Sequence, residues 1–284
     1  MKKLLLSAVT AVSAFTLAAC GGNENEVVKI GVNGADGAQW PILEEKLEKE
    51  GIEIELVEFA DYTLPNNALA QGEVDLNAFQ HISFLASYVN ESGNDLIPLG
   101  STVFAPLGLY SEKIKDIKEI KEGDKIAIPD DPSNQARALR LLESAGFIQL
   151  AEDFGLFGDP SKITANKLNL DIIPMTAQQT PHVLPDVVAA VINNGIAGQA
   201  GLNPGEDPIY RELAEDESVF PYVNIIAGRA EDKDNEVYQK IIELYHTEEI
   251  EKAIHDDTKG GQIMTVLSDG ELQQTFEDLK VQSK

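Results

Sequence analysis

Arg137 is the residue in this chain best placed to bind a charged ligand. It follows Asp131-Pro132-Ser133-Asn134, a run of helix-capping residues, and so falls near the start of a predicted helix. The free N–H groups and dipole of a helix start favour an anion, and a guanidinium can hold a carboxylate through two parallel hydrogen bonds. Two other interpretations remain open: Arg137 is a surface residue paired with Asp130 or Asp131, or Arg140 takes the ligand role.

Asn224 is a second candidate, because it interrupts an apolar stretch, 221–226, that is predicted to be a strand. A buried amide without hydrogen-bond partners costs about 1–3 kcal/mol, so Asn224 must find some. A ligand amine or carboxylate would supply them, and so would the backbone of a strand crossing between lobes. The sequence does not favour either.

Aromatic side chains form the third candidate group. Phe79, His81 and Phe84 lie close together in the sequence, and Tyr62 comes from a preceding loop. They could line a pocket for an apolar side chain. Aromatic residues at this spacing also commonly serve as plain core.

Other chemistries find no support in the sequence. His81, His182, His246 and His255 show no close pairing, so no zinc site is expected. No phosphate-binding glycine loop and no nucleophile with a base are present, so we predict neither a cofactor nor an enzyme. With 22 Lys+Arg against 48 Asp+Glu and a net charge of −26, nucleic acid is not expected as a partner.

The N-terminus indicates where the protein resides. Lys2-Lys3, an apolar run 4–17 and Leu17-Ala18-Ala19-Cys20 are typical of a secretory signal that ends at a lipid-attachment cysteine. Residues 1–19 are then removed, and Cys20, the only cysteine, carries the diacylglyceryl anchor. The alternative is a secreted protein with a chance cysteine at the cleavage site. Residues 20–27 are expected to be a flexible tether.

Hydrophobic periodicity predicts two α/β lobes that would position these side chains. Lobe 1 comprises 28–106 and 226–284, and lobe 2 comprises 107–225. The elements expected in lobe 1 are strands at 27–32, 52–56, 74–76 and 96–99 and helices at 41–50, 82–89 and 235–254. Those expected in lobe 2 are strands at 125–129, 168–173 and 186–192 and a helix at 136–145, with the strand 221–226 at its end. The helix 235–254 is expected to pack against lobe 1.

Several segments, taken in order along the chain, resemble the NlpA/MetQ family, the methionine-binding lipoproteins of ABC importers. The segments are the lipid-attachment signal, Asp61-Tyr62-Thr63-Leu64-Pro65-Asn66, Phe79-Gln80-His81, Pro106-Leu107-Gly108-Leu109-Tyr110-Ser111, 134–139, Val191-Ile192-Asn193 and Tyr222-Val223-Asn224. The resemblance covers essentially the whole chain, and the combination is far more specific than any single segment.

The resemblance implies a two-lobed, periplasmic-binding-protein-like (type II) α/β fold whose lobes close on a free amino acid. It places the carboxylate-binding arginine at Arg137 and the ligand-binding asparagines at Asn193 and Asn224. The side-chain pocket is similar to Tyr62, Phe79, His81 and Phe84. The implied ligand is L-methionine, and the implied partners are an ABC permease with its ATPase. The implied location is the extracytoplasmic face of the cell membrane, held by the lipid anchor.

Three segments depart from the family pattern. Phe84 stands where tyrosine is frequent, Asn194-Gly195-Ile196 replaces a threonine-asparagine-tyrosine stretch, and Trp40 replaces proline or histidine. Trp40 either lines the entrance or packs in the core. These differences leave room for alternatives: another apolar amino acid, a methionyl dipeptide, or a surface lipoprotein that acts as an adhesin.

Overall fold

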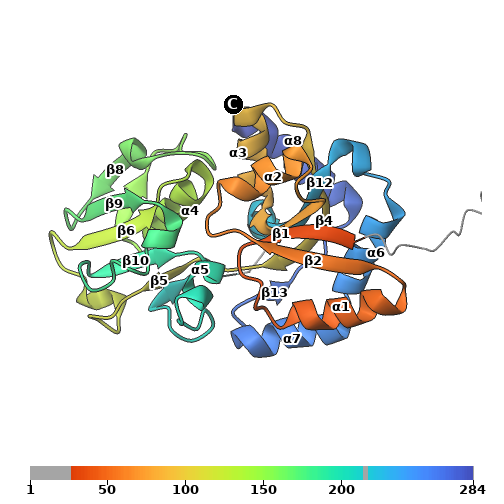
Figure 1. The fold of residues 1–284 in the computed structure, drawn as a ribbon. Coiled ribbons are helices and arrows are strands. Elements are labelled where there is room, and N and C mark those ends of the chain that lie inside the picture. The colour runs from red at the N-terminus through yellow and green to blue at the C-terminus, as the bar shows by residue number, and fades with distance from the viewer. Residues whose placement is uncertain (1–26, 214–216, 284) are drawn as a thin grey trace, which may run out of the picture.

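A computed structural model describes residues 27–213 and 217–283 and shows two α/β lobes side by side (Figure 1). The predicted signal, Cys20 and tether residues 20–26 lie outside the described residues. Val27, the last residue of the predicted tether, is the first residue of strand β1. In the part of the chain that is described, no helix has the length and apolar character needed to cross a membrane.

Lobe 1 is built on a six-stranded sheet in the order β13-β4-β12-β3-β1-β2. Strand β1 runs parallel to β2 and β3, whereas β12 is antiparallel to β3 and β4. Its strands are β1 (Val27–Val32), β2 (Glu53–Glu58), β3 (Leu76–His81), β4 (Leu96–Phe104), β12 (Val223–Arg229) and β13 (Ile263–Met264).

Helices cover both faces of this sheet, which explains why its strands are apolar on both sides. In β12, Ile226 packs in the core under one face, and Ile225 and Ala227 pack under the other. One face carries α1 (Gln39–Lys49), α6 (Glu236–Tyr245) and α7 (Glu248–Thr258). The other carries α2 (Leu64–Gln71), α3 (Ile82–Ser92) and α8 (Asp269–Gln282).

Lobe 2 is built on a five-stranded sheet in the order β11-β5-β10-β6-β9. Its strands are β5 (Gly108–Tyr110), β6 (Lys125–Pro129), β9 (Asp171–Met175), β10 (Ala189–Ile192) and β11 (Tyr210–Arg211). Helix α4 (Pro132–Ser144) packs in the core on one face of this sheet, and α5 (Asn194–Gln199) packs on the other. Strands β7 (Ile148–Leu150) and β8 (Ile163–Asn166) form a separate pair.

The chain passes between the two sheets at two places. The first is the segment 105–107, between β4 and β5, and the second lies between β11 and β12. The expected division at 106/107 falls in the first passage. The expected division at 225/226 falls inside β12, whose residue Val223 already pairs with Phe104 of β4.

The structure corrects the predicted helix 235–254, which is two helices, α6 and α7. Thr247 between them has an extended backbone, and three glutamates occupy the first turn of α7. Acidic residues at that position are typical of a new helix start, because they face its unpaired N–H groups. Both helices pack in the lobe 1 core, as expected of the single one.

Two other helices differ from the sequence analysis. Helix α4 starts at Pro132, with Asp131 as its cap, so Arg137 lies in the second turn rather than the first. Helix α2 was not assigned in the sequence analysis, and its consecutive asparagines, Asn66 and Asn67, are poor helix formers. Burial of Asn66 and its hydrogen bonds to Gln80 hold this helix in place.

Candidate ligand-binding cleft

One cavity between the lobes brings together all seven residues singled out in the sequence. Lobe 1 contributes Tyr62 from the loop after β2, Phe79 and His81 from β3, Phe84 from α3 and Asn224 from β12. Lobe 2 contributes Arg137 from α4 and Asn193 from the position just before α5. The remaining lining residues are Asn33, Gln39, Gln80, Thr102, Val103, Ala105, Asn134, Asn194, Gly195, Tyr245 and Gln262.

The cavity has a volume of about 120 Å³. That is close to the roughly 150 Å³ of a cavity that admits one benzene molecule, so the site has room for a small organic molecule. A carboxamide-rich lining with a single charged side chain suits a small molecule that carries both charges itself.

Arg137 is only 3% exposed and contacts neither of the aspartates considered in the sequence analysis. Its partner is Glu212, which accepts from Nε at 2.8 Å and from Nη2 at 2.5 Å. Nη2 also donates to the Ala105 carbonyl at 3.0 Å, and the guanidinium carbon lies 4.5 Å from the centre of the Tyr222 ring. Nη1 has no protein partner among the described residues, so it is the donor left for a ligand.

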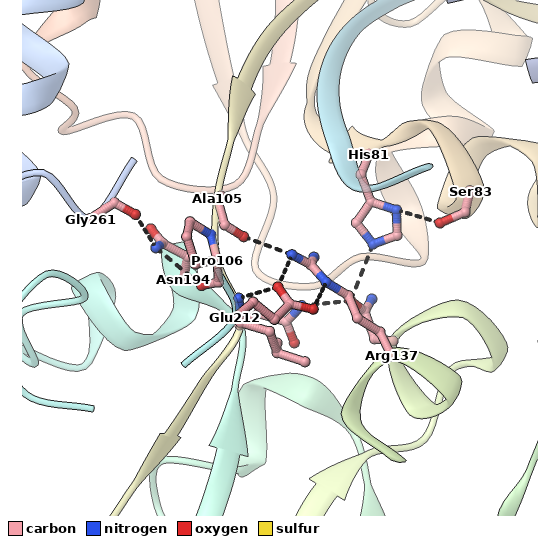
Figure 2. A network of polar contacts seen from close by, with 11 residues as sticks. His81, Ser83, Ala105, Pro106, Arg137, Asn194, Glu212 and Gly261 are labelled. Carbon is pink, nitrogen blue, oxygen red and sulfur yellow. Dashed lines mark hydrogen bonds and ion pairs between the residues drawn. The ribbon is translucent and has the colours of Figure 1, made fainter. Parts of the chain in front are cut away.

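A chain of hydrogen bonds between residues that line the cavity joins the two lobes. His81 Nδ1 accepts from the Phe84 N–H at 3.1 Å, which places the ring proton on Nε2. Nε2 then donates to Asn134 Oδ1 in lobe 2 at 3.2 Å, and Asn193 Nδ2 donates to the same oxygen at 2.7 Å. Asn134 Nδ2 in turn donates to the Asp131 carboxylate. Figure 2 shows His81 in this network.

The two asparagines each present polar atoms without protein partners. Asn193 is 7% exposed, and its Oδ1 is buried with no hydrogen-bond partner among the described residues. Asn224 lies opposite His81 in the β-ladder, and its side chain makes no hydrogen bond to backbone or side chains in the described part of the chain. The sequence analysis considered a ligand or a strand backbone as the partner of Asn224. The described backbone does not hydrogen-bond this side chain, so the ligand remains as a partner.

The aromatic residues contact one another and also face the cavity. Ring centres of Tyr62, Phe79 and Phe84 are each 5.9 Å apart, and the Phe84 and His81 rings are 6.2 Å apart. The side chains of Tyr62, Phe79 and Phe84 are half-buried. Burial raises the pKa of Tyr62, so its hydroxyl stays protonated at neutral pH. Trp40, by contrast, is buried against Tyr245 in the core and does not line the cavity.

Several cavity residues were missed in the sequence analysis. Asn134 was interpreted only as a helix cap, although its side chain binds both His81 and Asn193. Glu212, which binds Arg137 but does not itself line the cavity, gave no signal, because nothing distinguishes it from the chain's other acidic residues. Gln80 lay between two chosen residues and was passed over, although it lines the cavity. In residues 27–213 and 217–283, no group of three or more His, Cys, Asp or Glu could hold a metal ion.

His81 leads to a pH-dependent stability. Burial, aided by the Arg137 charge, lowers the pKa of His81 to about 3, whereas an unfolded histidine titrates near 6.5. As pH falls below 6.5, His81 therefore becomes protonated in the unfolded chain but stays neutral in the folded protein. The free energy of unfolding decreases as a result. Between pH 7 and 5.5 we expect His81 to account for a loss of about 1 kcal/mol in the free energy of unfolding. Denaturant titrations at both pH values measure it.

His81→Gln should abolish this loss, and His182→Gln, which changes an exposed residue, should retain it. Equal pH dependence in all three proteins would show that His81 does not remain neutral in the folded state.

The two sheets joined at 105–107 and the cavity between them define a two-lobed α/β binding protein for a small ligand. The family model of NlpA lipoproteins matches residues 28–266. The D-methionine-binding lipoprotein MetQ of Salmonella typhimurium is 38% identical over 258 residues, which cover 89% of this chain and 94% of that protein. The chain belongs to the NlpA lipoprotein family, as the resemblance in its sequence indicated.

Solved structures show the same architecture. Protein PG110 from Staphylococcus aureus superposes with a TM-score of 0.86 at 47% identity and covers 89% of this chain and 99% of its own. A nutrient binding protein from Burkholderia cenocepacia, solved bound to methionine, has a TM-score of 0.79 at 38% identity and covers 84% and 99%. These matches confirm the predicted two-lobed fold class.

Proposed function

We propose that this protein is the substrate-binding lipoprotein of an ABC importer. It is anchored through Cys20 on the extracytoplasmic face of the membrane, captures L-methionine, and delivers it to a permease driven by an ATPase. The observation that carries the proposal is the convergence of one buried guanidinium, two carboxamides and three aromatic rings on a single cavity between lobes. Two relatives support methionine as the ligand: one is named a D-methionine-binding lipoprotein, and the structure of the other was solved bound to methionine.

The cavity offers a partner for each part of a methionine zwitterion. Arg137 Nη1 would donate to the carboxylate, with Asn224 beside it. The buried, unpaired Asn193 Oδ1 would accept from the ammonium group. The thioether would lie against Tyr62, Phe79 and Phe84, where sulfur–aromatic contacts contribute about 0.3–1.5 kcal/mol beyond burial. That favours methionine modestly over leucine.

Contacts between the lobes explain how the permease would distinguish the ligand-bound protein from the free protein. Lys259 pairs with Glu206 at 2.7 Å, Gln199 donates to Asn33 at 3.1 Å, and Asn134 bonds His81. Each contact joins a residue of lobe 1 to one of lobe 2 and needs the lobes close together. A ligand bonded to both lobes stabilises that arrangement, which is the form a permease would recognise.

A thermal-shift screen tests the proposal. Each standard amino acid and a few methionyl dipeptides are added to the purified protein at about a hundred times the expected Kd, where a true ligand adds about 2.7 kcal/mol. For a chain of this size we expect L-methionine to raise Tm by about 5–10 °C. A larger increase in Tm with another amino acid or a dipeptide would identify that compound as the ligand instead of methionine. No shift with any compound would favour an adhesin and refute a small-molecule binder.

A further inference from the structure

Glu212 makes three hydrogen bonds beside Arg137, although it is not itself among the residues that line the cavity. Its carboxylate accepts from Arg137 Nε and Nη2, and Oε2 also accepts from the Leu107 N–H at 2.7 Å (Figure 2). Leu107 belongs to the segment 105–107 that joins the lobes. The carboxylate is therefore fixed to the backbone on one side and to the guanidinium on the other.

These bonds fix the plane of the Arg137 guanidinium. A carboxylate that accepts from two nitrogens of one guanidinium defines its plane, because both groups are flat and rigid. The Ala105 carbonyl takes a second hydrogen of Nη2, and the Tyr222 ring lies against the guanidinium face. Of the three guanidinium nitrogens, only Nη1 remains for a ligand.

The charge of Glu212 makes this arrangement unexpected for an anion site. A second carboxylate beside Arg137 repels the carboxylate of a ligand, so on charge alone Glu212 would weaken binding. Its geometry acts in the opposite sense, because it holds Nη1 in one direction before the ligand arrives. A preoriented donor loses less conformational freedom on binding.

We propose that Glu212 is a positioning residue. It orients Arg137 toward the ligand carboxylate and ties the guanidinium to the backbone of the segment 105–107. Asn194 supports the same segment, since its Nδ2 donates to the carbonyls of Pro106 and Gly261 at 3.3 and 2.8 Å. The inference rests on the proposed function, because it needs a ligand that carries a carboxylate.

The test compares methionine with methioninol, in which a hydroxymethyl group replaces the carboxylate. The quantity measured by calorimetry is the ratio of the two dissociation constants, which isolates the contribution of the carboxylate. In the unaltered protein we expect a preference for methionine of about tenfold to a hundredfold. In Glu212→Gln we expect this preference to fall by about fivefold or more, because the guanidinium is no longer oriented.

Glu143→Gln is the matched control. Glu143 also accepts a backbone N–H, from Leu150 at 2.8 Å, and lies on the same helix as Arg137 without contacting it. Its substitution should leave the preference unchanged. Glu212→Asp keeps the charge but shortens the side chain, and it too should lower the preference.

The outcomes separate the possible roles of Glu212. An unchanged or increased preference in Glu212→Gln would overturn the inference, because a residue acting only through charge gives an increase. Equal loss of affinity for both compounds would indicate a structural role and overturn it as well. If the unaltered protein binds neither compound, the proposed function fails before Glu212 is tested.

Discussion

Arg137→Gln should weaken methionine binding by on the order of a hundredfold in a calorimetric titration. The guanidinium is the only positive charge among the residues that line the described cavity, and it is almost fully buried. A carboxylate that enters this site without it loses its water shell and gains no charged partner in return. Hydrogen bonds from the neutral asparagines replace only part of that stabilisation.

The same substitution leaves the half-buried Glu212 carboxylate, 17% exposed, without its counter-charge, so a loss of folding must be separated from a loss of binding. An uncompensated charge that is fully buried can cost about 3–5 kcal/mol, and the partial exposure of Glu212 makes its cost smaller. The double variant Arg137→Gln/Glu212→Gln removes both charges and should recover stability while its affinity for methionine stays low. Arg140→Gln on the same helix is the control, because that guanidinium bonds the Gly155 carbonyl instead and does not line the cavity. Unchanged affinity in Arg137→Gln would refute the ligand role.

Local patterns in the sequence were sufficient for much of the fold. The predicted strands 27–32 and 125–129 coincide with β1 and β6, because short apolar runs bounded by polar residues and proline give clear limits. Helix α3 begins at Ile82 as predicted, where the His81 side chain caps its first turn. Helix α8 was not assigned, although Ser268 and Glu271 form a capping box that marks its start.

The cavity required more than local patterns. The sequence singled out seven residues that line it, chiefly through the resemblance to a known family, and the family is confirmed. Neither of the aspartates considered as possible partners, Asp130 and Asp131, contacts Arg137, whose partner Glu212 lies 75 positions away in the sequence. Only the passage of the chain between two sheets brings Glu212 to this position. Periodicity and capping rules carry no information about such a contact.

The balance of charge in the cleft follows from the same contact. The Arg137–Glu212 pair carries no net charge, and the low pKa of His81 keeps that ring neutral. A ligand with a single charge would therefore enter a low-dielectric site that has no net charge of the opposite sign. A zwitterion is better matched, since in the proposed binding mode its carboxylate would meet Nη1 while its ammonium would meet a carboxamide oxygen. The ammonium contact is accordingly the second place where a large effect is expected.

Asn193→Leu should lower methionine affinity by roughly tenfold to a hundredfold while changing the free energy of unfolding by less than about 1 kcal/mol. The buried Oδ1 has no partner in the described protein, so its removal relieves an unsatisfied group. Asn134 Oδ1 loses one donor but keeps the bond from His81. Calorimetry and denaturant unfolding measure the two quantities.

Asn166→Leu should give the opposite pattern. The Asn166 side chain donates to the Leu170 carbonyl and accepts from its N–H, both at 2.9 Å, in a turn of lobe 2 that does not line the cavity. Its substitution should cost about 1–3 kcal/mol of stability and leave methionine affinity unchanged. If Asn193→Leu instead destabilised the fold and bound methionine normally, Oδ1 would have a structural role and the ammonium would need another acceptor. The contrast between these two asparagines therefore tests whether an unpaired buried oxygen marks the point where the ligand binds.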